Sequence, residues 1–116
     1  MSDLGDLQKR VIAFRDARDW KQFHNAKDLA IALNLEATEV LEHFLWKTND
    51  EAREYLKTHK ADVAEELADT LYYVLLMSYD LGIDLPVAFN KKMTKNEAKY
   101  EIEKAKGNHK KYTELN

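Results

Sequence analysis

The chain has 116 residues, a formal net charge of −3, 45% hydrophobic residues, three glycines, one proline and no cysteine. So few glycines and prolines exclude the turn-rich pattern of an all-β protein, the lack of cysteine excludes disulfides and thiolate metal sites, and the acidic balance argues against a general nucleic-acid binder. No run approaches the ~18 apolar residues of a membrane span, and the first residues form no signal pattern. We therefore expect one all-α domain in the cytoplasm. We expect it to bind neither nucleic acid nor membrane.

Apolar residues recur at helical spacing along most of the chain, which predicts a bundle of four helices. Asn25 and Asn49 are residues that commonly cap helix N-termini. Gly82 is of the type that ends a helix, and Pro86 suits the first turn of the last one. The expected helices are 3–18, 26–47, 60–82 and 85–103, with a short helical turn over residues 50–56.

The last residues differ from the rest of the chain. Residues 104–116 are basic, contain Gly107 and lose the helical periodicity. No linker or internal repeat separates a second domain. We therefore expect residues 1–103 to form one helical domain and residues 104–116 to be the basic C-terminal tail of that domain.

Two acidic pairs stand out because each lies beside the apolar stripe of a long predicted helix. Glu36 and Glu39 form the first pair, and Glu66 and Asp69 form the second. Residues three apart share one face of a helix, so each pair points its carboxylates in nearly the same direction. If the two stripes pack together, the four acids meet at the rim of one interface. The stripes consist of Leu29, Leu33, Val40 and Phe44 in the first helix and of Val63, Leu67, Leu71 and Val74 in the second.

These acids favour a bound cation, because an unpaired carboxylate beside a packed face is costly. Oxygen ligands without thiolates or paired imidazoles suit a hard cation, with Mg²⁺ or Mn²⁺ favoured over zinc or copper. Mg²⁺ also binds substrate phosphates, which indicates phosphoryl or nucleotidyl chemistry. A single Glu-x-x-Glu pair is usually a solvated helix face, and two pairs in consecutive helices leave the solvated and the metal-binding interpretations both open.

Longer motifs, spread over nearly the whole chain, add to the acidic pairs. Together they resemble the MazG-like nucleotide pyrophosphohydrolases, and within that family the short single-domain branch that includes the dCTP pyrophosphatase-like enzymes. The acidic pairs alone are a weak signature, and the flanking tryptophans, the Lys…Asn segment and the tail in the right order make it specific. The segments are residues 14–24, 29–30, 36–46, 65–73, 82–85, 92–96 and 110–115.

The resemblance implies hydrolysis of a nucleoside triphosphate to the monophosphate and pyrophosphate, as housecleaning of the nucleotide pool. It also implies that Glu36, Glu39, Glu66 and Asp69 hold Mg²⁺, with Mn²⁺ as a substitute. Attack of water at the α-phosphorus develops charge on phosphate oxygens, which metal ions stabilise. Glu39 is the candidate for the base that accepts the proton of the water, although the residues alone do not separate a base from a ligand.

Further residues are candidates for contacts with the nucleotide, because bases stack on aromatic side chains and phosphates need cations. Trp46 is expected on the helical face of the acids, and Tyr73 lies one turn beyond Asp69. Lys92 and Asn96 are neighbours on one face of the last helix. By resemblance, Lys111 and Tyr112 belong to a tail segment that can close over the nucleotide, and a frayed basic end is the alternative. The candidates are Trp20, His24, Trp46, Tyr73, Lys92, Asn96, Lys111 and Tyr112.

Two other classes of protein remain open. A di-iron carboxylate bundle also places acids on facing helices, but it expects Glu-x-x-His motifs, whereas here His43 follows Glu39 at i+4. A non-catalytic helical module, which binds metal or a partner through solvated acids, is the second alternative. Metal-dependent turnover separates both from a hydrolase.

The central helices carry more apolar residues than one layer of four helices needs to bury. This excess predicts self-association into at least a homodimer, in which subunits complete each other's bundle, and the resemblance implies a homotetramer built from dimers as the alternative. The additional apolar residues are Ile31, Leu35, Leu75 and Leu76.

Overall fold

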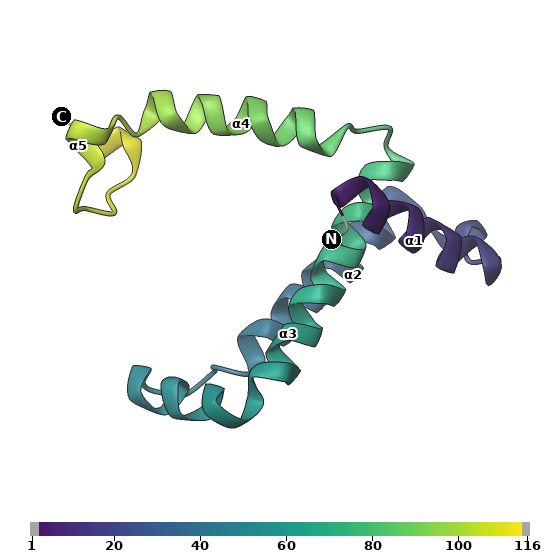
Figure 1. Ribbon diagram of the computed structural model, residues 1–116, viewed down its shortest axis with the longest axis horizontal. Helices are drawn as coiled ribbons and strands as arrows, with labels where there is room; N and C mark the ends of the chain where they lie inside the picture. The colour runs from purple at the N-terminus through teal and green to yellow at the C-terminus, as the bar shows by residue number, and fades with distance from the viewer. Residues whose placement is uncertain (1–2, 115–116) are drawn as a thin grey trace. The chain divides into compact units, whose positions relative to one another are not determined.

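The computed structural model describes residues 3–114, and in this range the chain forms helices and no strand, which confirms the prediction of an all-α fold (Figure 1). The chain divides into two compact parts, of which the first ends at Gly82 and the second begins at Ile83. The elements are α1 (Leu4–Ala17), η1 (Lys21–Phe23), α2 (Ala26–Glu42) and α3 (Asn49–Asp80) in the first part, and α4 (Leu85–Lys99), α5 (Ile102–Ala105) and η2 (Tyr112–Glu114) in the second.

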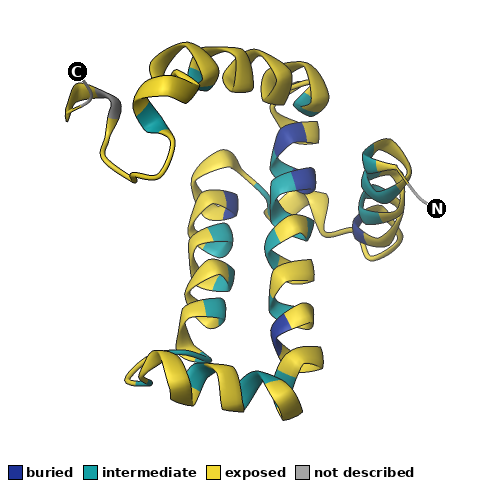
Figure 2. Cartoon of the chain, turned by 60° about the vertical axis from the view of Figure 1, so that its left-hand side comes forward, coloured by how far each residue is buried: buried dark blue, intermediate teal, exposed yellow. Residues whose placement is uncertain are grey.

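The first part consists of α2 and α3 side by side, with α1 packed against α3 (Figure 2). Local capping explains where two of these helices begin. Asp3 accepts a hydrogen bond from the backbone N–H of Asp6 at the start of α1. Asn25 does the same for Asp28 at the start of α2, so the prediction of Asn25 as an N-cap is confirmed.

Helix α3 differs from the prediction, because it is one continuous helix from Asn49 to Asp80 rather than a short turn followed by a helix from residue 60. Its N-cap is Thr48, not Asn49. The Thr48 hydroxyl accepts from the backbone N–H of Glu51, and the Glu51 carboxylate accepts from the backbone N–H of Thr48, both at 3.1 Å. This reciprocal capping box satisfies two backbone donors, which a cap at Asn49 would not do.

A bend in α3 accounts for the predicted break. Figure 2 shows the first part of the helix running across the direction of the rest. The carbonyl oxygen of Tyr55 accepts from the Thr58 hydroxyl at 3.4 Å and lies 3.1 Å from Nδ1 of His59. Side chains that bond to the carbonyls of their own helix compete with its backbone bonds and bend it.

The core lies on the inner faces of α2 and α3, and it differs in part from the predicted stripes. Leu29 and Val63 are buried as expected. Leu75 and Leu76, expected on the free surface, are 2% and 0% exposed, because α1 covers the C-terminal half of α3. Two residues expected inside are exposed instead, Leu67 to 55% and Leu71 to 37%.

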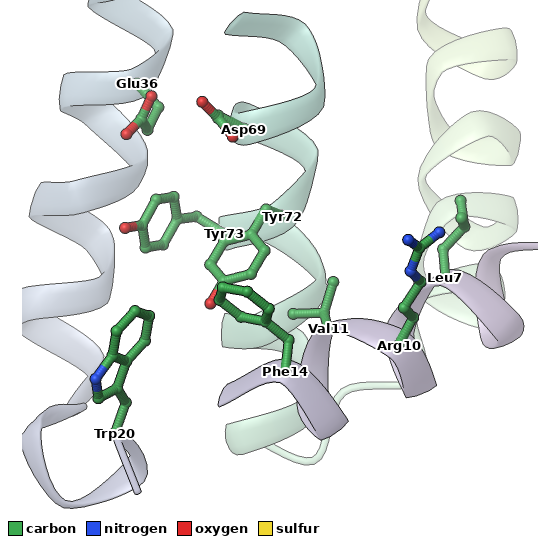
Figure 3. A pocket seen from close by; sticks show the side chains of 9 residues that line it. All are labelled: Leu7, Arg10, Val11, Phe14, Trp20, Glu36, Asp69, Tyr72 and Tyr73. Atoms are coloured by element: carbon green, nitrogen blue, oxygen red, sulfur yellow. The ribbon is translucent and has the colours of Figure 1, made fainter. Parts of the chain in front are cut away.

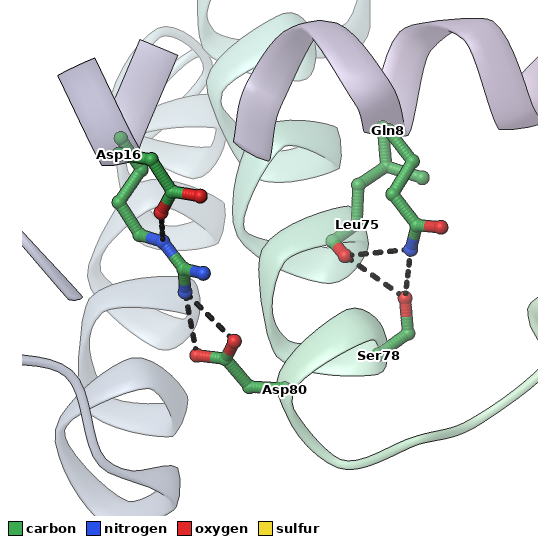
Figure 4. Close-up of polar contacts among 6 residues, drawn as sticks. Gln8, Asp16, Leu75, Ser78 and Asp80 are labelled. Carbon is green, nitrogen blue, oxygen red and sulfur yellow. Dashed lines mark hydrogen bonds and ion pairs between the residues drawn. The ribbon is translucent and has the colours of Figure 1, made fainter. Parts of the chain in front are cut away.

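Polar side chains fix α1 to the C-terminal end of α3 (Figure 4). Arg15 is fully buried, and its Nη1 donates to both carboxylate oxygens of Asp80 at 2.7 Å, while its Nε donates to Asp16 at 3.2 Å. Burial disfavours the charged guanidinium, but the bonds to Asp80 and Asp16 outweigh it and raise the pKa of Arg15. Two turns earlier on α1, the Gln8 amide donates to the carbonyl oxygen of Leu75 and to the Ser78 hydroxyl.

Gly82 follows the last turn of α3 with φ +68°, a conformation that glycine adopts readily, so its predicted place at the end of the helix is confirmed. In the second part, Asp84 caps α4 by accepting from the backbone N–H of Val87, and Pro86 lies in the first turn as predicted. Helix α4 ends at Lys99 rather than at residue 103. The extent of the domain, residues 1–103 with a tail, stays a prediction.

Among the described residues, no single helix is long and apolar enough to cross a membrane, and one pair, α3 with α4, reaches the required length and composition only when taken together.

Candidate functional site

The acidic pairs meet, as predicted, between the facing surfaces of α2 and α3. One carboxylate oxygen each from Glu36, Glu39 and Glu66 lies within 4.8 Å of the others. Glu36 and Asp69 line one cavity and point toward each other from the two helices (Figure 3). We call Glu36, Glu39, Glu66 and Asp69 the acid cluster.

The carboxylates disturb each other's ionisation. The pKa of Glu66 is raised to about 7, first because its protonated form hydrogen-bonds to Glu39, and then because of burial and of the charges of Glu39, Asp69 and Glu36. The pKa of Glu36 is also raised, by burial and by the charge and hydrogen bond of Glu39. Glu36 and Glu66 therefore favour their neutral forms unless a cation lies beside them.

The cluster fits a divalent cation. Oε2 of Glu36 and Oε2 of Glu66 are buried and have no hydrogen-bond partner among the described residues. Buried polar atoms without a partner are rare in proteins and call for an ion or a water. All the donors are carboxylate oxygens, which is the ligand type that hard cations such as Mg²⁺ and Mn²⁺ prefer.

A cavity of about 430 Å³ opens beside the cluster, with Glu36 and Asp69 in its wall (Figure 3). This volume is in the range of pockets that hold small molecules. The rest of the wall is mostly apolar and aromatic, and it comes from α1, from the turn before α2 and from α3. These lining residues are Leu7, Arg10, Val11, Phe14, Trp20, Tyr72 and Tyr73.

The aromatic rings of the cavity support each other edge to face. Phe14 lies 5.6 Å from Trp20 and 6.1 Å from Tyr72, and Tyr72 lies 5.0 Å from Tyr73, measured between ring centroids. Such pairs hold their rings in fixed orientations. Burial raises the pKa of both Tyr72 and Tyr73, so the phenols stay protonated and can donate hydrogen bonds. Trp20 and Tyr73, both predicted from the sequence, thus line the same cavity as the acids.

Trp46 does not lie where the sequence places it. The expected helix over residues 26–47 ends at Glu42, so Trp46 is in the following turn, with φ +66° and 92% of its surface exposed. It does not line the cavity. A bulky residue in the left-handed region is strained, and the turn that follows α2 imposes this conformation. Its contact with a nucleotide stays a prediction.

His24 also lies away from the acid cluster. It belongs to the wall of a second cavity, of about 480 Å³, together with Lys21, Asn25 and Tyr79. Its Nδ1 is buried without a hydrogen-bond partner in the described part of the chain. A role of His24 in binding a nucleotide stays a prediction.

The remaining candidates belong to the second part of the chain. Lys92 and Asn96 lie one turn apart on α4, as predicted, with Lys92 exposed and Asn96 partly buried. Lys111 is exposed and immediately precedes η2. The side chain of Tyr112 lies outside the described residues. The roles of all four at the acid cluster stay predictions.

Sequence reasoning missed the contribution of α1 to the cavity and the neighbours of Glu66. Val11 and Phe14 are three apart on α1, and this apolar spacing was the available signal. His43 at the end of α2 approaches Glu66, with 3.8 Å between its Nε2 and Oε1 of Glu66. That pair joins two different helices, so no local spacing indicates it.

Comparisons with known proteins identify the family of the chain. A model of the MazG-like family matches residues 31–115. The chain belongs to the MazG-like family. It is 36% identical to human dCTP pyrophosphatase 1 and 34% identical to the mouse protein of that name, in each case over 97% of this chain and 67% of the relative. The predictions of a MazG-like protein and of a hydrolase are therefore confirmed.

A solved pyrophosphatase structure has the same fold. The crystal structure of a pyrophosphatase from Archaeoglobus fulgidus is 37% identical, with a TM-score of 0.80, over 87% of this chain and 94% of the relative. Family membership favours the hydrolase over the di-iron bundle and over the non-catalytic helical module.

Proposed function

We propose that this MazG-like protein hydrolyses deoxynucleoside triphosphates, of the dCTP class, to the monophosphate and pyrophosphate with the help of Mg²⁺. The observation that carries the proposal is the cavity wall that Glu36 and Asp69 share with Trp20 and Tyr73. Acids that suit a phosphate-bound cation and rings that suit a base are thus adjacent. The curated relatives named for dCTP support this choice of substrate.

In this proposal the base enters the aromatic cavity and the phosphates point toward the acid cluster. Trp20 stacks on the base, which contributes about 1–3 kcal/mol per base. The Tyr73 hydroxyl donates to the sugar. The cluster would hold Mg²⁺, or Mn²⁺ as a substitute, and the ion would neutralise charge on the phosphate oxygens and make water more acidic. Water adds to the α-phosphorus, the bond to the β-phosphate oxygen breaks, and pyrophosphate leaves.

Glu39 is the proposed base among the four acids. Its side chain belongs to the cluster yet is exposed, unlike the half-buried Glu36 and Glu66, so it is accessible to the attacking water. A carboxylate in hydrogen-bond reach of a water accepts its proton as the new bond forms. Glu39 is also a proposed metal ligand, together with Glu36, Glu66 and Asp69.

Cations that bind the outer phosphates are proposed from the second part of the chain. Lys92 and Asn96 on α4, together with Lys111 and Tyr112 near the C-terminus, supply the charge and the donors that a triphosphate needs. Removal of a non-standard or excess deoxynucleotide from the pool is the proposed role. A cytoplasmic location accompanies this role as a prediction.

The test is release of pyrophosphate from a panel of canonical and modified nucleoside triphosphates, with Mg²⁺, with Mn²⁺ and with chelator. Wild type and Glu39→Gln are compared, and Thr38→Ala, on the neighbouring exposed position, is the matched control. We expect Mg²⁺-dependent formation of pyrophosphate and monophosphate, a loss of about 100-fold or more in Glu39→Gln, and little change in the control. Turnover that persists in chelator or in Glu39→Gln would contradict the proposal.

We also propose that residues 1–103 form one domain completed by self-association into a homodimer or homotetramer. On α2, Ile31 and Leu35 are 49% and 58% exposed, on the face opposite to the buried Leu29. A helix that is apolar on both faces is normally covered on both. A second copy of the chain is the proposed cover.

A further inference from the structure

His43 occupies an unusual place between the acid cluster and an aromatic group. It is the C-cap residue of α2, and its side chain is 16% exposed. Its Nε2 lies 3.8 Å from Oε1 of Glu66. On the other side of the ring, its Nδ1 lies 2.5 Å from the hydroxyl oxygen of Tyr55, a residue in the first part of α3.

The contact with Tyr55 holds one side of the imidazole. Nδ1 and the phenol hydroxyl are within hydrogen-bond distance, and in the tautomer that carries the ring N–H on Nε2 the hydroxyl donates to Nδ1. The proton of the ring is then on Nε2, which faces Glu66. An imidazole whose far nitrogen is held by a hydrogen bond has a fixed tautomer and a fixed orientation.

Tyr55 is itself held on several sides. The ring of His59 stacks on it with 4.0 Å between centroids and an interplanar angle of 2°. Nζ of Lys47 lies 4.3 Å from the centre of the Tyr55 ring and also donates to the backbone carbonyl of His43 at 2.7 Å. Phe44 approaches the ring edge to face at 6.3 Å. The hydroxyl therefore has little freedom to leave His43.

Glu66 has one oxygen toward this pair and one free. Oε1 is near His43, whereas Oε2 is buried and has no hydrogen-bond partner among the described residues. Nε2 and Oε1 are 3.8 Å apart, longer than a direct hydrogen bond, so the imidazole lies beside this oxygen and leaves Oε2 free for a cation. Glu66 also places a carboxylate oxygen within 4.8 Å of carboxylate oxygens of Glu36 and Glu39.

We propose that Tyr55 and His43 form a positioning pair, in which Tyr55 orients the imidazole and the imidazole orients the Glu66 carboxylate toward the metal. The inference rests on the metal site of the proposed function. Groups of this kind, one shell away from a metal, fix ligand geometry and raise affinity for the ion. The turn after α2 and the bend of α3 contribute to this arrangement, because they bring Tyr55 to the end of α2.

The test is the affinity of the nucleotide-free protein for Mn²⁺, measured by the EPR signal of the free ion, which needs no turnover. Tyr55→Phe removes only the hydroxyl and keeps the stacked ring. His43→Leu removes both nitrogens, and His43→Gln restores an N–H near the position of Nε2. Tyr79→Phe, at the other end of α3, is the matched control.

We expect Mn²⁺ affinity to fall about 10-fold in His43→Leu and several-fold in Tyr55→Phe, to recover in part in His43→Gln, and to stay unchanged in Tyr79→Phe. The melting temperature of the metal-free Tyr55→Phe variant is expected to stay near that of the wild type. Wild-type affinity in both Tyr55→Phe and His43→Leu would overturn the inference and leave the metal site standing. A wild type that binds no Mn²⁺ would overturn the metal site as well.

A second outcome separates positioning from direct ligation. Pulsed EPR detects nitrogen bound to Mn²⁺ through its nuclear coupling. We expect the wild type to show no nitrogen coupling from His43, because a positioning residue acts through Glu66 and does not bind the ion. A nitrogen coupling that disappears in His43→Leu would overturn the inference and make His43 a ligand.

Discussion

Glu66 is the residue at which several effects converge. Glu39, Glu36 and Asp69 raise its pKa, and its Oε1 lies 3.8 Å from Nε2 of His43. Each of the acidic neighbours disfavours its ionised form, and a bound cation would reverse their effect. The state of this carboxyl therefore reports whether the cluster holds a metal.

The raised pKa of Glu66 predicts a pH dependence of the metal-free fold. The folded value is about 7 and the ordinary value is 4.5, so folding favours the protonated form. This contribution to stability is fully present below about pH 4.5 and is lost as the pH rises through about 7. We expect the melting temperature of metal-free protein to fall over that range, and to fall less steeply in Glu66→Gln. Equal slopes in the two proteins would contradict this account.

Removal of the Trp20 ring is expected to weaken substrate binding rather than chemistry. In Trp20→Ala the base loses a stacking partner worth about 1–3 kcal/mol, so KM is expected to rise about 10-fold with a smaller change in kcat. Phe23→Ala, in the adjacent η1 helix and 66% exposed, is the control and is expected to leave KM unchanged. Steady-state kinetics measures both. A Trp20→Ala variant with wild-type KM would show that the base binds elsewhere.

The positions of individual site residues could be predicted where they depend on spacing within one helix. The acids and Tyr73 follow from i,i+3 and i,i+4 relations within single helices, which the structure keeps. Trp46 was misplaced because its position depends on where α2 ends. The pairing of His43 with Tyr55 depends on the turn and the bend between them, and residue patterns do not specify such geometry.

The elements of the first part depend on one buried ion pair. Arg15 of α1 is fully buried and bonds to Asp80 of α3 through both carboxylate oxygens. Helix α1 also supplies Val11 and Phe14 to the cavity wall. The Arg15–Asp80 ion pair holds α1 against α3, so it affects both the stability of the fold and the shape of the cavity.

Loss of the Arg15–Asp80 ion pair is expected to lower the free energy of unfolding substantially. Asp80→Ala leaves the Arg15 charge buried without its main partner, which typically costs about 3–5 kcal/mol. Asp50→Ala removes a fully exposed pair with Arg53, for which the cost is about 1 kcal/mol or less, and it is the matched control. Urea denaturation measures both free energies of unfolding. A similar small loss in the two variants would mean that α1 is held mainly by its apolar contacts.

The elements themselves were predictable where caps and periodicity agree. Asn25, Gly82 and Pro86 mark helix ends both in the sequence and in the structure. The start of α3 was missed because Thr48 and Glu51 cap it together, one residue before the expected cap. Leu75 and Leu76 were placed outside because the packing of α1 on α3 is a tertiary contact that periodicity does not reveal.

For the molecule as a whole, the apolar surface outside the core is the main unexplained feature. Among the described residues, the buried apolar side chains are Leu29, Val63, Leu75 and Leu76, whereas Ile31, Leu35 and Leu67 remain about half exposed. A surface of this kind on the central helices marks a protein–protein contact. Self-association is the prediction that belongs to this scale.

Leu35→Glu is expected to dissociate the assembly. The substitution places a charge on the outer apolar face of α2, where a second copy would have to bury it. Ala30→Glu adds the same charge to an exposed position of the same helix, away from this face, and is the control. Light scattering after size-exclusion chromatography is expected to show an oligomer for the wild type and Ala30→Glu and a smaller species for Leu35→Glu. A monomeric wild type would contradict the prediction.

The central claim is that the acid cluster and the aromatic cavity form one site, which directs water to the α-phosphorus of a nucleoside triphosphate. The most direct measurement is the hydrolysis of dCTP by the wild type in ¹⁸O-labelled water with Mg²⁺, with mass analysis of both products. We predict that the label enters the monophosphate and not the pyrophosphate. Label in the pyrophosphate, or release of phosphate in place of pyrophosphate, would contradict the account.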